Sequence, residues 1–486
     1  MERHGIYTAL GTSALAAAQA FKVPVYCGTA PVQSILGGSG NVNAPVLAED
    51  LEQAKAALGY SDDWASFTLC EAMYAHFVEK KVGPIVLINV LNPASHKEET
   101  GGSKTATPAS GKVILTDMSL AVLDTVAITG KTASTYTLSY DPDTEKLTIT
   151  ETASGSLGTE ELTITYDIVD PEAVEDDDLI GTYDGEAVST GLQAIRNVYQ
   201  LTGYMPGTIL CPGFSHLPTV RAAMLAMSQK VNGHWDNMFY TDVPLADGET
   251  AMTLSGAAAW KGTNGYNAAN EKVFFPMWET LEGKIYHLSV LNACNLAILE
   301  AGANGVPYQS ASNTALPAGH YYFGEERDTY LPDEEAINEK LNANGITSVA
   351  FVAGEWKLWG AHAAAYDAQT DEGEHVSETR RAMLIYLGNR FQIKYGNIID
   401  KSISKNALQS IAAAENEYAQ RLVGMGMILY GFCSLVINQS AAGIEELQRG
   451  DFSFVYEVTT TPLAKSLTLT LSYTAKGLSS YFKEDA

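Results

Sequence analysis

The fold is decided by two short apolar runs, Val23-Pro24-Val25-Tyr26-Cys27 and Ile85-Val86-Leu87-Ile88-Asn89-Val90. The second run is continuously apolar apart from Asn89, which is typical of a strand buried on both faces of a sheet. Between the runs we expect a helix over 50–58 and a second helix from Thr68, because Thr68 and Glu71 have the spacing of a capping box. A strand, two helices and a further strand are typical of a right-handed crossover unit, so the folded part is predicted to begin with an α/β unit.

The composition changes sharply after Pro93. From about residue 104 to 168 the chain is rich in Thr and Ser and alternates between polar and apolar residues, with a turn at Asp141-Pro142-Asp143. This pattern predicts a β-hairpin within an inserted all-β domain.

Two further α/β regions follow the insert. One is expected from about residue 191, with an apolar strand at 208–211. The other begins with a helix at residue 333, and two long helices then lead to closing strands at 453–459 and 466–473. The chain has 486 residues, which is long enough for about three domains that each bury a core.

The chain is strongly acidic. Its 30 Lys and Arg stand against 57 Asp and Glu, which gives a formal charge of −27. Such a protein repels a phosphate backbone, so nucleic acid is not an expected partner. Twelve of the acids, without a single Lys or Arg, lie between Leu147 and Ile195. No apolar stretch approaches the ~20 residues of a membrane helix, so direct membrane insertion is not expected either.

Motifs for enzymatic chemistry are incomplete. Gly213-Phe214-Ser215-His216 begins like the nucleophile elbow of an α/β-hydrolase, but Leu217 stands where a second glycine would allow the tight turn. A hydrolase-like enzyme that uses Ser215 is the alternative reading. The favoured one places Ser215 at the start of a helix that has Pro218 in its first turn. The five cysteines and nine histidines lack metal-ligand spacing, so no metal and no cofactor is expected.

One stretch departs from the acidic composition. Between Val376 and Lys405, six cations stand against only Glu378 and Asp400, a local balance of +4. Two readings remain open: an ordinary helix surface whose cations pair with the chain's own acids, and a docking face for an acidic partner. The six cations are Arg380, Arg381, Arg390, Lys394, Lys401 and Lys405.

Both ends of the chain carry short strand-like runs. At the start this run includes Ile6 and Tyr7, and near the end four apolar residues alternate with Thr and Ser. The four are Leu467, Leu469, Leu471 and Tyr473. The later run is either a regular strand of the chain's own sheet or a strand that pairs with a neighbouring subunit.

A series of short motifs then follows one order along most of the chain. The motifs are Val23-Pro24-Val25-Tyr26-Cys27-Gly28-Thr29-Ala30-Pro31-Val32, Gly59-Tyr60-Ser61-Asp62-Asp63-Trp64, Thr68-Leu69-Cys70-Glu71-Ala72, Val82-Gly83-Pro84-Ile85-Val86-Leu87-Ile88-Asn89-Val90, Pro212-Gly213-Phe214-Ser215-His216, Leu341-Asn342-Ala343-Asn344-Gly345-Ile346 and Trp359-Gly360. In order and spacing they resemble the tail sheath proteins of contractile bacteriophages and of phage-tail-like bacteriocins.

The resemblance implies a structural protein and not an enzyme. Sheath proteins polymerise helically, in hexameric rings, around an inner tube, and contraction drives that tube through a bacterial envelope, which in a phage leads to genome ejection. The implied partners are further copies of the chain, the inner tail tube protein, and the baseplate and tail terminator proteins. The implied location is the virion or bacteriocin particle, assembled in the cytoplasm of the bacterial host.

The resemblance also implies how the chain is divided. The expected fold is a mixed, multidomain α/β protein with a discontinuous inner domain, a middle α/β domain and an inserted all-β outer domain. The expected boundaries are an N-terminal arm at 1–20, the inner domain at 21–100 and 333–474, the β-rich insert at 101–178, the middle domain at 179–332 and a C-terminal tail or arm at 475–486. In this arrangement the six cations are candidate tube-facing residues, and the terminal runs are candidate strands exchanged between subunits.

Overall fold

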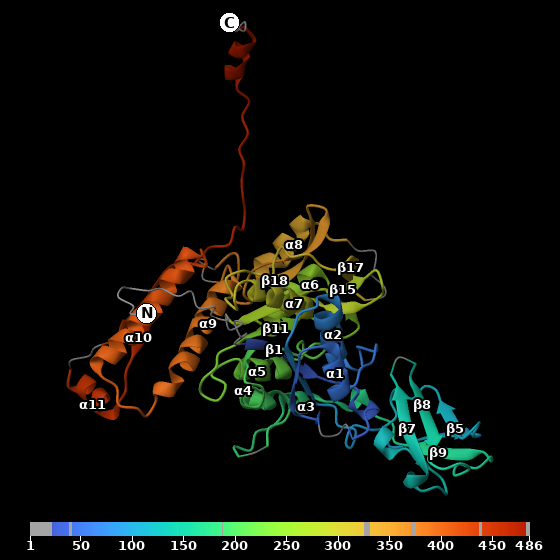
Figure 1. Ribbon diagram of the computed structural model, residues 1–486. Helices are drawn as coiled ribbons and strands as arrows, with labels where there is room; N and C mark the ends of the chain where they lie inside the picture. Colours follow the sequence, from blue (N-terminus) through green and yellow to red (C-terminus); the bar gives the residue numbers. More distant parts are fainter. Residues whose placement is uncertain are drawn as a thin grey trace, which may run out of the picture.

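The computed structural model shows a central α/β body, a small β-domain on one side and a helical unit on the other (Figure 1). It describes residues 22–37, 41–142, 144–186, 188–324, 331–370, 373, 375–436 and 440–482. Among these residues, none of the helices combines the length and the apolar character needed to cross a bilayer.

The body is built on an eight-stranded sheet whose six central strands run parallel, with one antiparallel strand at each edge. In spatial order the strands are β19 (Glu355–Trp359), β18 (Ile346–Val352), β14 (Glu271–Phe274), β11 (Met238–Asp242), β10 (Met205–Leu210), β1 (Lys22–Gly28), β3 (Ile85–Asn89) and β2 (Pro45–Ala48). Every residue of β3, β10 and β11 is buried. Parallel strands covered by helices on both faces have this continuous apolar character, which is why 85–90 was predictable as a strand.

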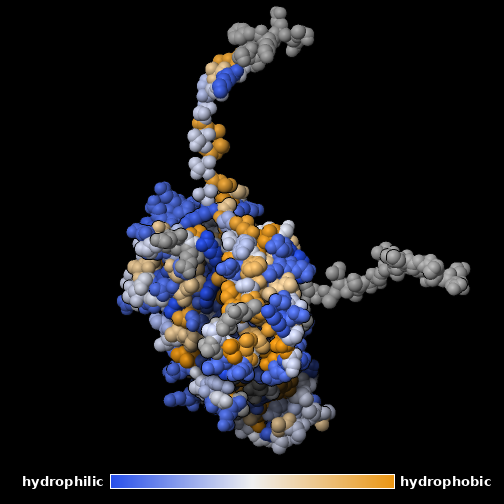
Figure 2. Space-filling model, turned by 90° about the vertical axis from the view of Figure 1, so that its left-hand side faces the viewer, coloured by the Kyte–Doolittle hydropathy of each residue, from blue (hydrophilic) through white to orange (hydrophobic). Residues whose placement is uncertain are grey.

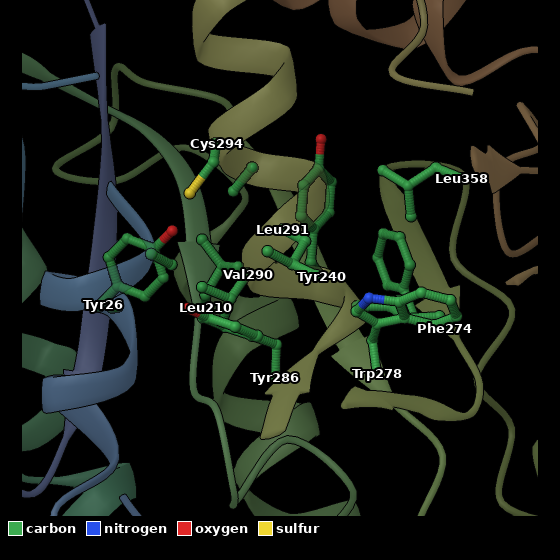
Figure 3. Packing of buried hydrophobic residues seen from close by; sticks show 14 of the residues in the cluster. Tyr26, Leu210, Tyr240, Phe274, Trp278, Tyr286, Val290, Leu291, Cys294 and Leu358 are labelled. Atoms are coloured by element: carbon green, nitrogen blue, oxygen red, sulfur yellow. The ribbon is translucent and has the colours of Figure 1, made fainter. Parts of the chain in front are cut away.

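Helices cover both faces of the sheet. They include α1 (Leu51–Leu58), α2 (Thr68–Tyr74), α5 (Pro218–Met227), α6 (Leu254–Thr263), α7 (Leu288–Gly302) and α8 (Glu334–Lys340). On one face, Val290 and Leu291 of α7 belong to a buried cluster with Tyr26, Leu210 and Phe274 of the strands (Figure 3). A second buried cluster, on α5 and the 191–198 segment, covers the other face. The sheet is therefore the middle layer of a three-layer body.

The predicted capping box at the start of α2 is wrong. Phe67 precedes the helix, and no side chain caps it. Thr68 instead exchanges two hydrogen bonds with Thr29, and the Glu71 carboxylate accepts from the backbone N–H of His287 (2.6 Å) and contacts its Nδ1 (2.7 Å). Contacts with distant parts of the chain have replaced the local cap, because both side chains are buried.

The sheet also differs from the predicted division into domains. β1, from the expected inner domain, pairs with β10, from the expected middle domain, and β14 pairs in turn with β18. Strands from 21–100, 179–332 and 333–474 therefore share one sheet, which crosses the expected boundary between the inner and middle domains, and that division stays a prediction. The spatial order of parallel strands leaves no local trace in a sequence, because their hydrogen bonds join segments far apart in the chain.

Residues 102–166 form a separate β-domain of two three-stranded sheets. One sheet contains β4 (Gly102–Ala106), β9 (Leu162–Tyr166) and β6 (Ala127–Ile128), and the other β5 (Lys112–Leu115), β8 (Lys146–Glu151) and β7 (Tyr136–Asp141). Leu147, Ile149 and Ile164 are fully buried in its own core. The predicted hairpin about Asp141 is confirmed, since β7 and β8 pair on either side of that turn.

The C-terminal unit consists of two long helices and a β-ribbon. Its elements are α9 (Glu378–Tyr395), α10 (Lys405–Gly424), β20 (Ile428–Leu435), α11 (Ala441–Arg449) and β21 (Phe454–Thr460). Met383, Leu422 and Ile428 belong to its buried core, and the Tyr386 and Tyr418 hydroxyls lie 2.7 Å apart between the two helices.

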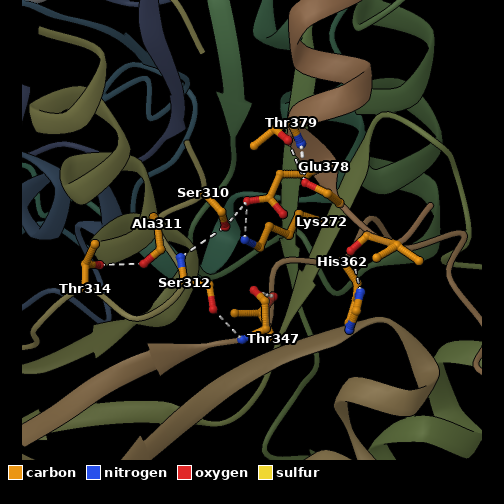
Figure 4. A network of polar contacts seen from close by, with 12 residues as sticks. Lys272, Ser310, Ala311, Ser312, Thr314, Thr347, His362, Glu378 and Thr379 are labelled. Atoms are coloured by element: carbon orange, nitrogen blue, oxygen red, sulfur yellow. Dashed lines mark hydrogen bonds and ion pairs between the residues drawn. The ribbon is translucent and has the colours of Figure 1, made fainter. Parts of the chain in front are cut away.

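A buried ion pair joins this unit to the sheet. The Nζ of Lys272, on β14, lies 2.8 Å from Oε1 of Glu378, the first residue of α9 (Figure 4). Ser310 Oγ donates to the same carboxylate oxygen at 2.7 Å. The side chains of Lys272 and Glu378 are 0% and 4% exposed. At that burial each charge depends on the other, because neither can be hydrated.

We expect Glu378→Gln to lower the free energy of unfolding by about 3–5 kcal/mol, since it leaves the Lys272 ammonium buried without its counter-charge. Urea denaturation measures the change. The matched control is the double substitution Lys272→Met with Glu378→Leu, which removes both charges and should recover most of the loss. A loss below about 1 kcal/mol in Glu378→Gln, the range of an exposed pair, would contradict this role.

Candidate functional site

The chain beyond β21 extends away from the rest of the molecule (Figure 1). Residues 461–474 have no regular secondary structure and pair with no strand among the described residues. The exposed fractions are 93% for Leu467, 79% for Leu469, 83% for Leu471 and 87% for Tyr473. The reading of this run as a strand of the chain's own sheet is therefore wrong. We use the name C-terminal arm for residues 461–474, which precede the tail expected at 475–486. The other predicted strand residues, Ile6 and Tyr7, lie outside the described residues.

The second element of the site is the ribbon formed by β20 and β21. The two strands pair antiparallel over their full length and, within the described part of the chain, with no third strand. One face of the ribbon packs on α10, where a Cβ on Gly431 would come within 2.9 Å of the Ala419 side chain. The outer edge of β20 is partly occupied, because the Asn416 side chain of α10 bonds to both the backbone N–H and the carbonyl oxygen of Cys433. The outer edge of β21 is therefore the one that offers backbone N–H and C=O groups to an added strand.

The other face of the ribbon carries three exposed apolar side chains among polar ones. Phe432 faces Glu457 and Val455 faces Ser434 across the strands, and Tyr430, Phe432 and Val455 are 47–49% exposed. Figure 2 shows hydrophobic residues gathered on this side of the molecule and along the arm. Isolated apolar residues on a surface are ordinary, but a contiguous group marks an interaction surface.

The short helix α11, between the two strands of the ribbon, adds to this surface. Ile444 and Leu447, one turn apart, are 53% and 54% exposed. Sequence reasoning missed both α11 and the exposed ribbon face. The sequence did contain two signals, the i, i+3 spacing of Ile444 and Leu447 and the alternation that places Tyr430 and Phe432 on one face of a strand. The second signal became informative only when the structure showed that the opposite face of the ribbon packs on α10.

The predicted basic stretch divides into two groups. Arg390 and Lys394 both pair with Glu415 of α10, at 2.6 and 2.8 Å. Burial opposes ionisation of Glu415, but its contacts with Lys394, Tyr395 and Arg390 outweigh that effect and hold its pKa below the usual value. For these two cations the structure shows an internal pairing that ties α9 to α10.

The remaining cations lie on the surface. Arg380 and Arg381, in the first turn of α9, line a cleft of about 420 Å³ that also includes Leu384 and the end of β21. Lys401 and Lys405 are exposed between α9 and α10. Three acids, Asp371, Glu372 and Glu374, directly precede this stretch in the sequence and reduce the balance from 371 to 405 to +1. The basic character is therefore weaker than the run from Val376 suggested.

Ser215 is buried and hydrogen-bonded within the body of the protein. It is 1% exposed, and its Oγ accepts a hydrogen bond from the backbone N–H of Asp242 at 2.9 Å. Within the described residues, no histidine is hydrogen-bonded to it. Helix α5 begins with Pro218 in its first turn, as predicted, but Leu217 occupies the capping position. No group of side chains in the described part of the chain has the makeup of a metal site.

We compared the chain with family models, curated proteins and solved structures. No family model matches the sequence. The tail sheath protein of Burkholderia phage BcepMu is 26% identical over 481 residues, which cover 93% of this chain and 92% of that protein.

Two solved structures have related chains. The PVC sheath complex of an extracellular contractile injection system, in its contracted state, aligns with a TM-score of 0.54 at 12% identity and covers 98% of this chain and 99% of that one. A sheath tail protein from Listeria innocua aligns at 0.45 and 11% identity, over 90% of this chain and 95% of that one. The chain is thus similar in sequence to a phage tail sheath protein over nearly its whole length, and it shares its fold with the PVC sheath chain.

Proposed function

We propose that this chain is the structural subunit of a contractile tail sheath and that its copies are linked by their C-terminal arms. The observation that carries the proposal is the coexistence, in one chain, of an exposed arm with strand-like alternation and a two-stranded ribbon whose β21 edge is paired with no strand among the described residues. The arm residues 467–473 and strand β21 have the same length of seven residues, about 23 Å when extended. The arm has no strand to pair with, and strand β21 has an edge without a neighbouring strand among the described residues.

Strand addition supplies the energy for such a link. An arm that pairs with the ribbon of a neighbouring copy gains backbone hydrogen bonds along its length. Because Leu467, Leu469 and Leu471 alternate with Thr and Ser, all three would then lie on one face of the enlarged sheet. Burying each leucine contributes about 1.5–3 kcal/mol, which offsets the entropy lost when the arm becomes ordered.

A link from one copy to the next generates an open polymer. The arm and the ribbon are different surfaces of the chain, so their contact is heterologous, and heterologous contacts that do not close produce helical assemblies. We infer that the copies form a helical sheath of hexameric rings around an inner tail tube, attached to baseplate and tail terminator proteins. The sheath would be assembled in the host cytoplasm and act in the virion or bacteriocin particle.

During contraction, the body of each subunit would move as a rigid unit, and the flexible arms would keep neighbouring subunits connected. The three-layer body has a continuous core from β2 to β18 and is suited to move as one unit, while the arms keep neighbouring copies connected. We expect the energy to be stored in a metastable extended lattice during assembly. The hydrolase alternative has no support, because Ser215 is buried and bonded to Asp242.

The predicted arrangement along the radius of the sheath stays a proposal. The insert at 102–166, with its own core, would project outward. Of the six candidate tube-facing cations, Arg380, Arg381, Lys401 and Lys405 are the ones available to a partner, because Arg390 and Lys394 are paired with Glu415.

We expect Leu469→Asp to abolish polymerisation of the purified chain, because it places a charge on the apolar face of the added strand. Thr470→Asp is the matched control, since its side chain lies on the opposite face; it should reduce polymer yield far less. Negative-stain microscopy, with circular dichroism to confirm folding, measures both. Deleting 466–486, or residues 1–20, should likewise prevent polymerisation without unfolding the chain. Normal polymer from Leu469→Asp would overturn the exchange of C-terminal arms.

The tube contact has a separate test. Charge reversal of Arg380 and Arg381 to Glu should reduce co-assembly of sheath on the inner tube by about tenfold or more, because like charges then face an acidic partner. Polymerisation of the sheath alone should continue. Lys146→Glu, in the β-insert, is the control substitution of the same type. Unchanged co-sedimentation with the tube would remove these two residues from the interface.

A further inference from the structure

The first residues of the C-terminal arm are attached to the chain's own body. Thr461 Oγ1 donates to the carbonyl oxygen of Gly426 at 2.7 Å. Four residues later, Lys465 Nζ donates to the hydroxyl of Tyr366 at 2.7 Å and lies 4.7 Å from the centre of its ring. From Leu467 onward the apolar side chains of the arm are 79–93% exposed. The arm therefore separates from the body at Lys465, and not at Thr460 where β21 ends.

Tyr366 is itself firmly placed. It is 7% exposed, and its ring stacks on the imidazole of His362 with centroids 3.9 Å apart and planes 9° from parallel. The Nδ1 of His362 lies 2.7 Å from the carbonyl oxygen of Val376, immediately before the N-cap of α9. The backbone N–H of Ala364 bonds to the carbonyl oxygen of Glu271 in β14. The segment under Lys465 thus belongs to the sheet body as well as to the start of α9.

We propose that the contact between Lys465 and Tyr366 is a latch that fixes the pivot of the C-terminal arm and aims the arm from the sheet body toward its neighbour. This inference rests on the proposed exchange of arms. Without the latch the free segment would begin after Thr461 and include 462–474 instead of 466–474. Effective concentration falls with about the −3/2 power of the free length, so losing the latch dilutes the arm by about twofold.

The latch is suited to be reversible. Lys465 is exposed, and one hydrogen bond from an exposed ammonium to a hydroxyl biases an equilibrium by about two- to fivefold. Such a bias orients the arm during assembly, yet it gives way when the lattice rearranges. The bond depends on the Tyr366 hydroxyl, so Tyr366→Phe removes it while the ring stays stacked on His362.

Limited trypsin digestion of the unpolymerised full chain tests the latch directly. Lys465 is itself a cleavage site, and Lys476 serves as the internal standard further along. We expect Tyr366→Phe, which removes the hydroxyl but keeps the stacked ring, to speed cleavage after Lys465 about two- to fivefold and to leave cleavage after Lys476 unchanged. Tyr183→Phe is the matched control, because its ring also lies beside a cation, Arg196, at 4.8 Å. Equal cleavage rates after Lys465 in the wild type and in Tyr366→Phe would overturn the latch.

An assembly measurement separates the latch from the exchange of arms. Tyr366→Phe should raise the critical concentration for polymerisation about two- to fivefold, whereas deleting 466–486 should prevent polymerisation altogether. Normal polymer from the deletion would refute arm exchange, whatever the digestion shows. A digestion effect in Tyr366→Phe with an unchanged critical concentration would refute the role of the latch in aiming the arm.

Discussion

The parallel pairing of β1 with β10 is the constraint on which the rest of the structure depends. It joins the first strand of the described residues to a strand more than 170 residues later and places both in the middle of one sheet. Because this sheet is buried on both faces, it carries one hydrophobic core on each face and forms the middle layer between them. A subunit built in this way transmits force between neighbours without deforming, which is what a sheath that drives a tube requires.

The C-terminal unit is the opposite kind of structure, because its hydrogen bonding and its burial are both incomplete. The ribbon of β20 and β21 pairs with no third strand among the described residues, and the arm leaves four large apolar side chains in water. The buried acids of this unit are nevertheless paired with cations, Glu415 with Arg390 and Lys394, and Glu378 with Lys272. The unit is therefore held together internally but leaves apolar side chains exposed at its surface, and under the proposal other copies of the chain cover them.

The sequence predicted local features well and distant pairings poorly. The strands at 23–27 and 85–90, the helix at 50–58 and the hairpin about Asp141 could be predicted because each depends on neighbouring residues. The capping role of Thr68 and Glu71 failed because both side chains bind distant residues instead. The spatial order of the parallel strands could not be predicted for the same reason, since it is decided by contacts between distant segments.

The candidate site shows the same limit. The alternation of Leu467, Leu469 and Leu471 was visible in the sequence, but its exposure was not, so two readings remained open until the structure excluded one. The cations between Arg380 and Lys405 looked like one surface, and Glu415, 21 and 25 residues away from its partners, divided them. A charge count cannot show which cations are already paired.

The most direct test of the account is a cryo-electron microscopy reconstruction of the polymer formed by the purified chain. The account predicts a hollow helical assembly in which residues 467–473 of one copy form a strand beside the β20–β21 ribbon of another. A polymer in which those residues pair within their own chain, or a chain that remains monomeric at high concentration, would contradict it.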